Sequence, residues 1–378
     1  MARNLLKSEA WAYYSSGADD EITLRENHSA FHRIYLRPKV MVNVKKVDTT
    51  ATLLGTKTSL PIYITAAALG KLGHPEGEVI LTRAAGTRNV IQMLPTLASC
   101  ALEEMVSTKK TNQTQWFQLY VNSDRQVTKR LVQKAEKLGC KALCITVDAP
   151  ALGRREKDMR TKFVDDAPDV QQGEKNVERS QGAARAISSF IDPSLEWRDI
   201  AWFRSITKMP IVIKGIQRGE DALLAVKHGV DAIVISNHGG RQLDTSRSGI
   251  EVLPEVISAL EKAGVRKKIQ VFVDGGFRRG SDIYKAIALG ADAVGLGRPF
   301  LYAMSTYGQE GVEKCIDILR DELEMVMRLM GTPILSKVAG EKDDLVDTRS
   351  LGIHTAKTPT DHLSEEVYDR LRVVKSKL

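Results

Sequence analysis

Eight short apolar runs recur along the chain, separated by longer stretches of mixed polarity. They fall at 60–67, 91–94, 116–121, 142–148, 210–215, 232–237, 269–276 and 293–297. Each has the length of a β-strand with little polar alternation, which is typical of strands buried on both faces. Amphipathic spacing between the runs predicts helices over 77–89, 124–139, 219–229, 249–264 and 281–290. Because parallel strands need crossover helices, the pattern predicts an α/β fold, a (β/α)8 TIM barrel.

Further segments lie before, within and after this barrel pattern. Helical spacing over 4–14 and 22–34 predicts an N-terminal helical lid within 1–58, followed by the barrel over 59–331. A charged stretch with weak periodicity, 153–195, follows the fourth strand, and we expect this long insertion to be mobile. The tail, 332–378, mixes Pro, Thr, Lys and Asp, so we expect it to wrap a neighbouring surface or subunit without adding core. We expect a single domain over 1–378.

Composition and charge exclude several classes of protein. Hydrophobic residues make up 43% and charged residues 27% of the 378, which is ordinary for a globular domain. The net charge of +8 is dispersed, which indicates a mild preference for anions and no nucleic-acid partner. No apolar run approaches the ~18 residues of a spanning helix, so we expect a soluble protein with no membrane partner.

The cysteines and the N-terminus add two expectations. No CxxC pair or metal-type His spacing is present, so we expect reduced structural thiols and no metal site at Cys100, Cys140, Cys144 and Cys315. The first residues, MARNLLKSEAWAYY, show no secretory signal. The chain also begins within a predicted helix, as would a chain from which an upstream segment has been removed.

The stretch IVISNHGGRQLD, 233–244, carries the most concentrated candidate chemistry. Its β-branched run ends at Ser236, Asn237 and His238, so a polar cluster lies at the C-terminal end of a strand. Two glycines allow a tight turn, and Arg241 returns with a planar cationic fork. A base and an anion clamp could therefore face one small molecule. The alternative is a satisfied strand-end histidine and a surface arginine.

Polar or small residues recur at the C-terminal ends of most predicted strands, where barrel enzymes place their chemistry. They are Ala66, Ala67, Ala68, Gln118, Tyr120, Thr146, Asp148, Lys214, Ser236, His238, Asp274, Gly276, Gly297 and Arg298. Repetition at matching positions is not explained by packing alone, so we predict an active site at this end. Glycines and arginines in 272–282 and 287–300 further suggest a phosphate cradle after the last two strands, unless those glycines only shape turns.

Hydrolytic motifs such as Gly-x-Ser-x-Gly or HExxH are absent, so the remaining residues favour an oxidation site. Lys214 at a strand end could stabilise a cofactor atom that becomes negative; a salt-bridged barrel lysine is the alternative.

On these residues the chain resembles the FMN-dependent L-2-hydroxy acid oxidising family. The resemblance covers about residues 10 to 335 and is most specific in SNHGGRQLD, FVDGG and GRPF, while REKDM and FIDPSL favour its flavocytochrome branch. Two departures stand out. Pro95 occupies a position where relatives commonly present a serine to the flavin, and the haem domain of the flavocytochrome branch is missing.

The resemblance implies a role for each catalytic candidate. His238 would be the general base, stabilised by Asp148 when protonated. Arg241 and Tyr13 would bind the substrate carboxylate, Tyr120 would hydrogen-bond the hydroxyl, and Arg155 would be a second, more mobile cation. Lys214 would lie at the flavin N1/O2 edge.

The resemblance also implies the residues around FMN and the substrate side chain. Ala68 and Leu97 would line a pocket suited to a methyl group. The isoalloxazine would be held by Ala66, Ala67, Gln118, Thr146 and Ser236. Ribityl and phosphate contacts would come from Asp274, Gly276, Arg278, Gly297 and Arg298.

The implied reaction is oxidation of L-lactate to pyruvate, with electrons passed from FMN to an external acceptor. Without the haem domain, the cytochrome c route is not expected. The alternatives are a lactate or glycolate oxidase that produces hydrogen peroxide from oxygen, and a non-catalytic flavin-binding barrel. Family members imply a homotetramer, and the fungal form implies the mitochondrial intermembrane space; otherwise we expect a cytoplasmic protein.

Overall fold

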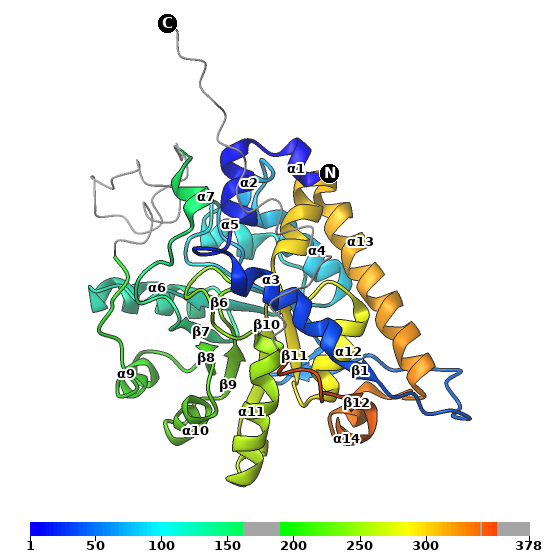
Figure 1. Ribbon diagram of the computed structural model, residues 1–378. Helices are drawn as coiled ribbons and strands as arrows, with labels where there is room; N and C mark the ends of the chain where they lie inside the picture. Colours follow the sequence, from blue (N-terminus) through cyan, green and yellow to red (C-terminus); the bar gives the residue numbers. More distant parts are fainter. Residues whose placement is uncertain (162–189, 341, 354–378) are drawn as a thin grey trace, which may run out of the picture.

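A closed barrel of parallel strands forms the centre of the molecule (Figure 1). The computed structural model describes residues 1–161, 190–340 and 342–353. The strands follow one another around the barrel in chain order, with β11 pairing back to β4. The predicted parallel barrel is therefore confirmed. Its strands are β4 (Ile62–Ile64), β5 (Ile91–Leu94), β6 (Gln115–Leu119), β7 (Leu143–Thr146), β8 (Ile211–Ile216), β9 (Ala232–Ile235), β10 (Gln270–Asp274) and β11 (Ala293–Leu296).

Helices surround the barrel (Figure 1). The five predicted between strands are confirmed to within two residues at each end: α4 (Glu78–Arg88), α6 (Arg125–Lys137), α10 (Gly219–Lys227), α11 (Gly249–Lys262) and α12 (Gly280–Ala288). Other helices had no predicted bounds: α5 (Leu102–Ser107), α7 (Glu156–Met159), α9 (Asp199–Ile206) and α13 (Arg298–Met330). The longest, α13, has 33 residues and kinks at Gly308, whose φ of 60° is not helical.

Two apolar clusters make up the core. The larger fills the layer between strands and helices. The smaller fills the barrel interior with residues such as Tyr63, Trp116 and Phe272, and it includes Leu53 from outside the barrel strands. Leu53 belongs to a hairpin of β2 (Ala51–Leu53) and β3 (Thr56–Thr58), tied to the start of β10 by Gln270 through Leu54 N and Thr52 O. This hairpin closes the N-terminal end of the barrel and leaves the other end for a site.

The N-terminal segment packs on that other end. It contains α1 (Ala2–Leu5), α2 (Ser8–Ser15) and α3 (Ile22–Ser29), so the helix predicted over 4–14 is in fact two short helices. The helix predicted over 22–34 ends at Ser29 and continues as a 3-10 turn over Ala30–Arg33. Asp244 accepts hydrogen bonds from Ile22 N and Thr23 N at the start of α3, which holds this helix against the loop after β9.

The C-terminal segment contributes to the core, so the expectation that it adds none is wrong for 332–353. Buried apolar residues lie within it, and β12 (Val346–Asp347) pairs antiparallel with β1 (Tyr35–Leu36). Isolated or paired apolar residues among polar ones make these contacts, which is why no periodic pattern revealed them. They are Leu335, Val338, Leu345, Val346 and Leu351. The rest of the tail, 354–378, and residues 162–189 of the predicted mobile insertion lie outside the described residues.

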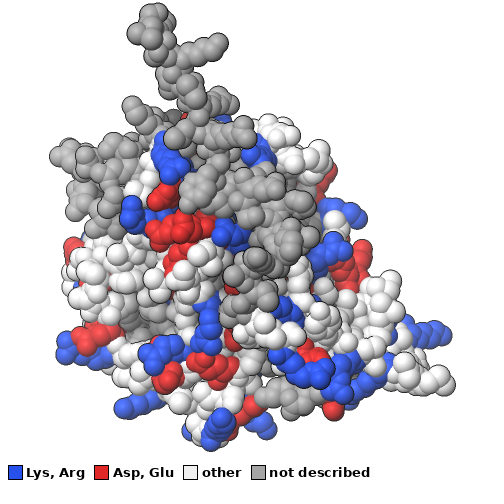
Figure 2. Space-filling model, in the orientation of Figure 1, with Lys and Arg blue, Asp and Glu red and all other residues white. Residues whose placement is uncertain are grey.

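Charged residues, cysteines and long helices bear on further sequence-based expectations. Figure 2 shows basic and acidic residues interspersed over the described part of the face in view, in keeping with a dispersed net charge of +8. Cys100, Cys140, Cys144 and Cys315 are free thiols. Within 1–161, 190–340 and 342–353, no helix is long and apolar enough to cross a membrane, and no cluster of His, Cys, Asp or Glu is arranged to hold a metal ion.

Candidate active site

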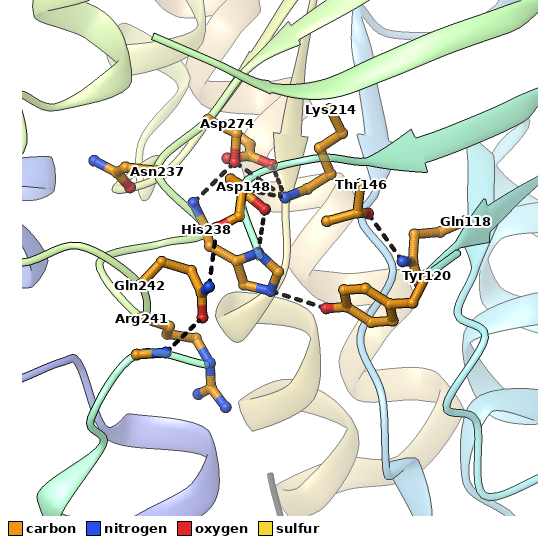
Figure 3. Close-up of polar contacts among 12 residues, drawn as sticks. Gln118, Tyr120, Thr146, Asp148, Lys214, Asn237, His238, Arg241, Gln242 and Asp274 are labelled. Carbon is orange, nitrogen blue, oxygen red and sulfur yellow. Dashed lines mark hydrogen bonds and ion pairs between the residues drawn. The ribbon is translucent and has the colours of Figure 1, made fainter. Parts of the chain in front are cut away.

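His238 lies at the C-terminal end of the barrel between two polar partners (Figure 3). Its Nδ1 is 2.8 Å from Asp148 Oδ1, and its Nε2 is 3.1 Å from the Tyr120 hydroxyl. With Asp148 ionised, Nδ1 carries the proton, so the Nε2 lone pair faces Tyr120 and can accept a proton. His238 lies at the strand end as predicted, with both ring nitrogens close to polar partners, and its role as a base remains a prediction.

The backbone that presents His238 is strained and tightly packed. His238 has φ of 60°, a left-handed conformation that is uncommon outside glycine, and the next two residues also have positive φ. A Cβ on Gly239 would lie 2.9 Å from Arg298 Nη1, and one on Gly240 would lie 2.6 Å from Leu24 backbone atoms. Both glycines are therefore needed to turn the chain where the N-terminal segment packs.

The imidazole and its carboxylate partner have strongly altered acidities. Removal from water lowers the pKa of His238 to about 4, although Asp148 acts in the opposite direction. Burial alone would raise the pKa of Asp148, but Lys214 and His238 together bring it below its ordinary value. At neutral pH the pair is therefore a neutral base beside an ionised carboxylate, which is the state that a general base requires.

Lys214, on β8, is a buried cation close to the carboxylates of Asp148, just after β7, and Asp274, at the end of β10. Its Nζ donates to Ser236 Oγ at 3.1 Å and lies 3.6 Å from Asp148 Oδ2 and 3.9 Å from Asp274 Oδ2. Burial alone would lower the pKa of Lys214, but the two carboxylates raise it above its ordinary value. Lys214 is therefore salt-bridged, as the alternative interpretation holds, and it also lines the pocket at this end of the barrel.

Three arginines gather around the same pocket. Arg241 Nη1 donates to Tyr13 O at 2.6 Å, and its guanidinium lies 4.8 Å from the centre of the Tyr13 ring. Arg155 donates to Arg241 O, and burial together with Arg241 lowers the pKa of Arg155 to about 10. Burial and Arg241 also lower the pKa of Arg298 to about 9. Cations gathered around one buried pocket mark a site suited to an anion.

Arg298 is engaged in a way that the sequence did not reveal. Its guanidinium donates to the carbonyl oxygens of Tyr14, Gly239 and Ser16, each within 2.9 Å. It therefore fastens the N-terminal segment to the loop after β9. Its predicted phosphate contact remains a prediction.

One pocket joins these groups, with an empty volume of about 1070 Å³ that includes its open mouth. Most predicted site residues line it directly: Tyr13, Ala66, Ala67, Ala68, Leu97, Tyr120, Arg155, Lys214, His238, Arg241, Asp274, Gly276, Arg278, Gly297 and Arg298. Asp148, Gln118, Thr146 and Ser236 lie behind that surface, where Gln118 Nε2 donates to Thr146 Oγ1 at 2.9 Å. The pocket also contains residues that sequence reasoning missed, notably Leu152, Ile191, Phe277 and Leu301.

The pocket fits a phosphorylated, redox-active cofactor. Asp274 Oδ1 is buried without a hydrogen-bond partner among the described residues, so it can accept from a bound ligand. Arg278 lines the same wall, and burial lowers the pKa of Arg278, as expected for a cation placed to meet an anion. Gly276 has a packing reason of its own, since a Cβ there would lie 1.7 Å from Asn27 O. The predicted cofactor contact of Gly276, which also lines the pocket, remains a prediction.

The chain matches the FMN-dependent dehydrogenase family over residues 2–344. It belongs to that family. It is 56% identical over 371 residues to L-lactate dehydrogenase (cytochrome) of Wickerhamomyces anomalus, covering 98% of this chain and 64% of that protein. It is 41% identical to glycolate oxidase of Spinacia oleracea, covering 90% of this chain and 92% of that one. The chain thus spans less than two thirds of the length of the fungal dehydrogenases it matches.

Solved structures agree with the family assignment. The recombinant flavin-binding domain of baker's yeast flavocytochrome b2 superposes with a TM-score of 0.86 at 51% identity, covering 100% of this chain and 92% of that one. A mandelate oxidase superposes with a TM-score of 0.84 at 35% identity, covering 92% of this chain and 96% of that one. The resemblance to an FMN-dependent family, its TIM-barrel fold and its cofactor are confirmed.

Proposed function

We propose that this chain oxidises L-lactate to pyruvate and passes the electrons to an external acceptor. The observation that carries the proposal is a neutral His238, held between Asp148 and Tyr120 and facing two arginines across one pocket. A carboxylate between the arginines would present an adjacent hydroxyl to the base. The higher identity to fungal L-lactate dehydrogenases than to glycolate oxidases supports lactate as substrate.

The side chains divide the work of this reaction. Arg241 and Arg155 bind the substrate carboxylate, and the planar fork of an arginine suits bidentate contact. Tyr120 hydrogen-bonds the hydroxyl, and His238 Nε2 accepts a proton from the substrate. Asp148 then stabilises the resulting imidazolium, because an ion pair replaces a neutral contact. Tyr13 holds Arg241 in place through its carbonyl and its ring.

When bound, FMN supplies the two-electron acceptor for the oxidation. Lys214 is the buried cation available to offset negative charge on the ring, and Ser236 orients it. Asp274 would offer its unpaired oxygen to a ribityl hydroxyl, and Arg278 with Gly297 would hold the phosphate. Gln118 and Thr146, which hydrogen-bond to each other just behind the pocket surface, would position the ring edge.

The apolar part of the pocket supports a small substrate side chain. Ala68 and Leu97 line it as predicted, and Leu152 and Ile191 add further apolar surface. An apolar wall of this kind suits a methyl group on the substrate, because a methyl group needs no hydrogen-bond partner. Because one methylene changes discrimination by only about 1–3 kcal/mol, slightly longer L-2-hydroxy acids remain substrates with lower kcat/KM.

An oxidase that reduces oxygen to hydrogen peroxide is the second candidate. The chain spans 92% of the length of the spinach glycolate oxidase, so no additional domain is needed for that activity to be complete. The two candidates differ in their acceptor and share the substrate half-reaction.

Assembly and location follow the resemblance. A homotetramer is supported by exposed apolar residues along α13: Tyr307, Ile318, Met325 and Leu329. The fungal relatives suggest the mitochondrial intermembrane space for the whole protein. Sedimentation at micromolar concentration tests the tetramer, and a monomer would contradict it.

The test of function is an anaerobic absorbance spectrum of the FMN-loaded protein before and after L-lactate, followed by air. We expect L-lactate, and not D-lactate, to bleach the flavin. Slow recolouring in air with fast reduction of ferricyanide would support a dehydrogenase, and rapid recolouring with peroxide would support the oxidase. Loaded flavin that no L-2-hydroxy acid bleaches would contradict both.

A further inference from the structure

The side chain of Gln242, on the loop after β9 and labelled in Figure 3, uses every hydrogen-bonding position of its amide. Nε2 donates to the carbonyl oxygens of Asp148 at 2.9 Å and Ala151 at 2.8 Å. Oε1 accepts from Gly153 N at 3.2 Å and from Arg155 Nη2 at 3.3 Å. A primary amide has two donors and two acceptor lone pairs, so the group is saturated. Gln242 is 7% exposed, and its four partners all lie on the loop after β7.

The two loops touch where Gln242 joins them. A Cβ on Gly153 would lie 2.4 Å from Arg241 O and 2.7 Å from Gln242 Cα, so no side chain fits between the loops. Arg155 Nε also donates to Arg241 O at 3.2 Å. The β7 loop carries Asp148 and Arg155, and the β9 loop carries Arg241. Gln242 is therefore a cross-link between the two halves of the proposed substrate site.

This cross-link affects the effective charge of Arg155 as well as its position. The Arg155 guanidinium donates to two neutral oxygens, Arg241 O and Gln242 Oε1. A neutral acceptor orients the guanidinium and leaves its positive charge available to an anion. A carboxylate at the same place would offset that charge and would also face the carbonyl oxygens of Asp148 and Ala151 without a proton to donate.

We propose that Gln242 is a positioning residue that fixes Arg155 and the Asp148 loop against the catalytic loop, and that its neutrality preserves the anion affinity of the site. The inference rests on the proposed function, in which Arg155 and Arg241 bind the substrate carboxylate. Gln242 touches neither substrate nor cofactor and acts through these neighbours.

The test compares Gln242→Met and Gln242→Glu in the FMN-loaded protein. Both variants keep the approximate length of the side chain; Met removes all four hydrogen bonds, and Glu keeps the acceptors but adds a negative charge. Affinity is measured by titrating the flavin spectrum with oxalate, a small carboxylate with no hydrogen to lose. We expect the Kd for oxalate and the KM for L-lactate to rise on the order of tenfold in Gln242→Met and further in Gln242→Glu, with a smaller fall in kcat.

Gln270→Met is the matched control, because Gln270 also bridges two backbone segments, at the opposite end of the barrel. It should lower Tm and leave the Kd for oxalate unchanged. Parent-like oxalate affinity in Gln242→Met, or equal affinities in the Met and Glu variants, would overturn the proposal. If Gln242→Glu does not fold, the comparison of the Kd for oxalate between Gln242→Met and Gln270→Met tests the proposal. Oxalate binding needs no turnover, so failure of the parent to oxidise L-lactate would refute the function without deciding the role of Gln242.

Discussion

At the scale of single residues, His238 is held neutral by its surroundings and prepared for its charged state by one partner. Removal from water lowers its pKa to about 4, while Asp148 favours the protonated imidazole. A base with these two influences stays unprotonated before the reaction and gains an ion pair once it has accepted a proton. Lys214 keeps Asp148 ionised, so the carboxylate is ready when the imidazolium forms.

The acid limb of the pH profile tests this balance. The proposed reaction needs neutral His238, so kcat/KM should be level near neutrality and fall as pH drops through about 4. In Asp148→Asn the carboxylate that raises the pKa of His238 is gone, so the limb should move to lower pH. The plateau should fall by about two to four orders of magnitude, because the imidazolium has lost its ion pair. A parent limb near the ordinary histidine pKa of about 6.5 would contradict the assigned environment.

Individual site residues were predictable to different degrees. His238, Arg241 and Lys214 could be identified because polar residues at strand ends interrupt an apolar pattern. Gln242 could not be assigned a role, since its partners lie 87 to 94 residues away on another loop. Ile191 was equally hidden, because an apolar residue outside the strand pattern gives no sign of which cavity it lines.

At the scale of elements, the N-terminal segment and the loop after β9 form one unit. Asn27 and Asn237 exchange amide hydrogen bonds at 2.9 and 2.8 Å although 210 residues separate them. Asp244 accepts from the first amides of α3, which satisfies donors that the helix itself leaves unpaired. The motif SNHGGRQLD therefore carries the proposed catalytic residues and also a contact, from Arg241 to Tyr13 O, that places Tyr13 beside them.

Asp244→Ala should loosen this unit. Loss of a helix cap lowers the free energy of unfolding by about 1 kcal/mol, and the displaced segment should also raise the KM for L-lactate through Tyr13. Asp124→Ala is the control, because Asp124 caps α6 by accepting from Gln126 N, away from the site. Thermal denaturation and steady-state kinetics are measured for both. A KM that rises equally in the two variants would contradict a specific role for Asp244.

At the scale of the whole molecule, the two ends of the barrel differ: the β2–β3 hairpin packs against the core at one end, and the pocket lies at the other. Strands and intervening helices were predictable because their periodicity is local. The hairpin β2–β3 and the core residues of 332–353 were not, because they reach the core through apolar runs of one or two residues, too short to show a period. Leu53 is the clearest case: it is fully buried in the barrel interior, although only Leu54 extends its apolar run within a Thr-rich stretch.

Leu53→Ala tests this separation. Removing a fully buried leucine leaves a cavity beneath the barrel interior and should lower the free energy of unfolding by about 2–5 kcal/mol. The KM for L-lactate should not change, because Leu53 packs at the end of the barrel opposite His238. Leu5→Ala, at a leucine that is 62% exposed, should change stability by less than about 0.5 kcal/mol. Chemical denaturation and kinetics on the same preparations measure both effects. A raised KM in Leu53→Ala, below its unfolding transition, would show that the two ends of the barrel are coupled.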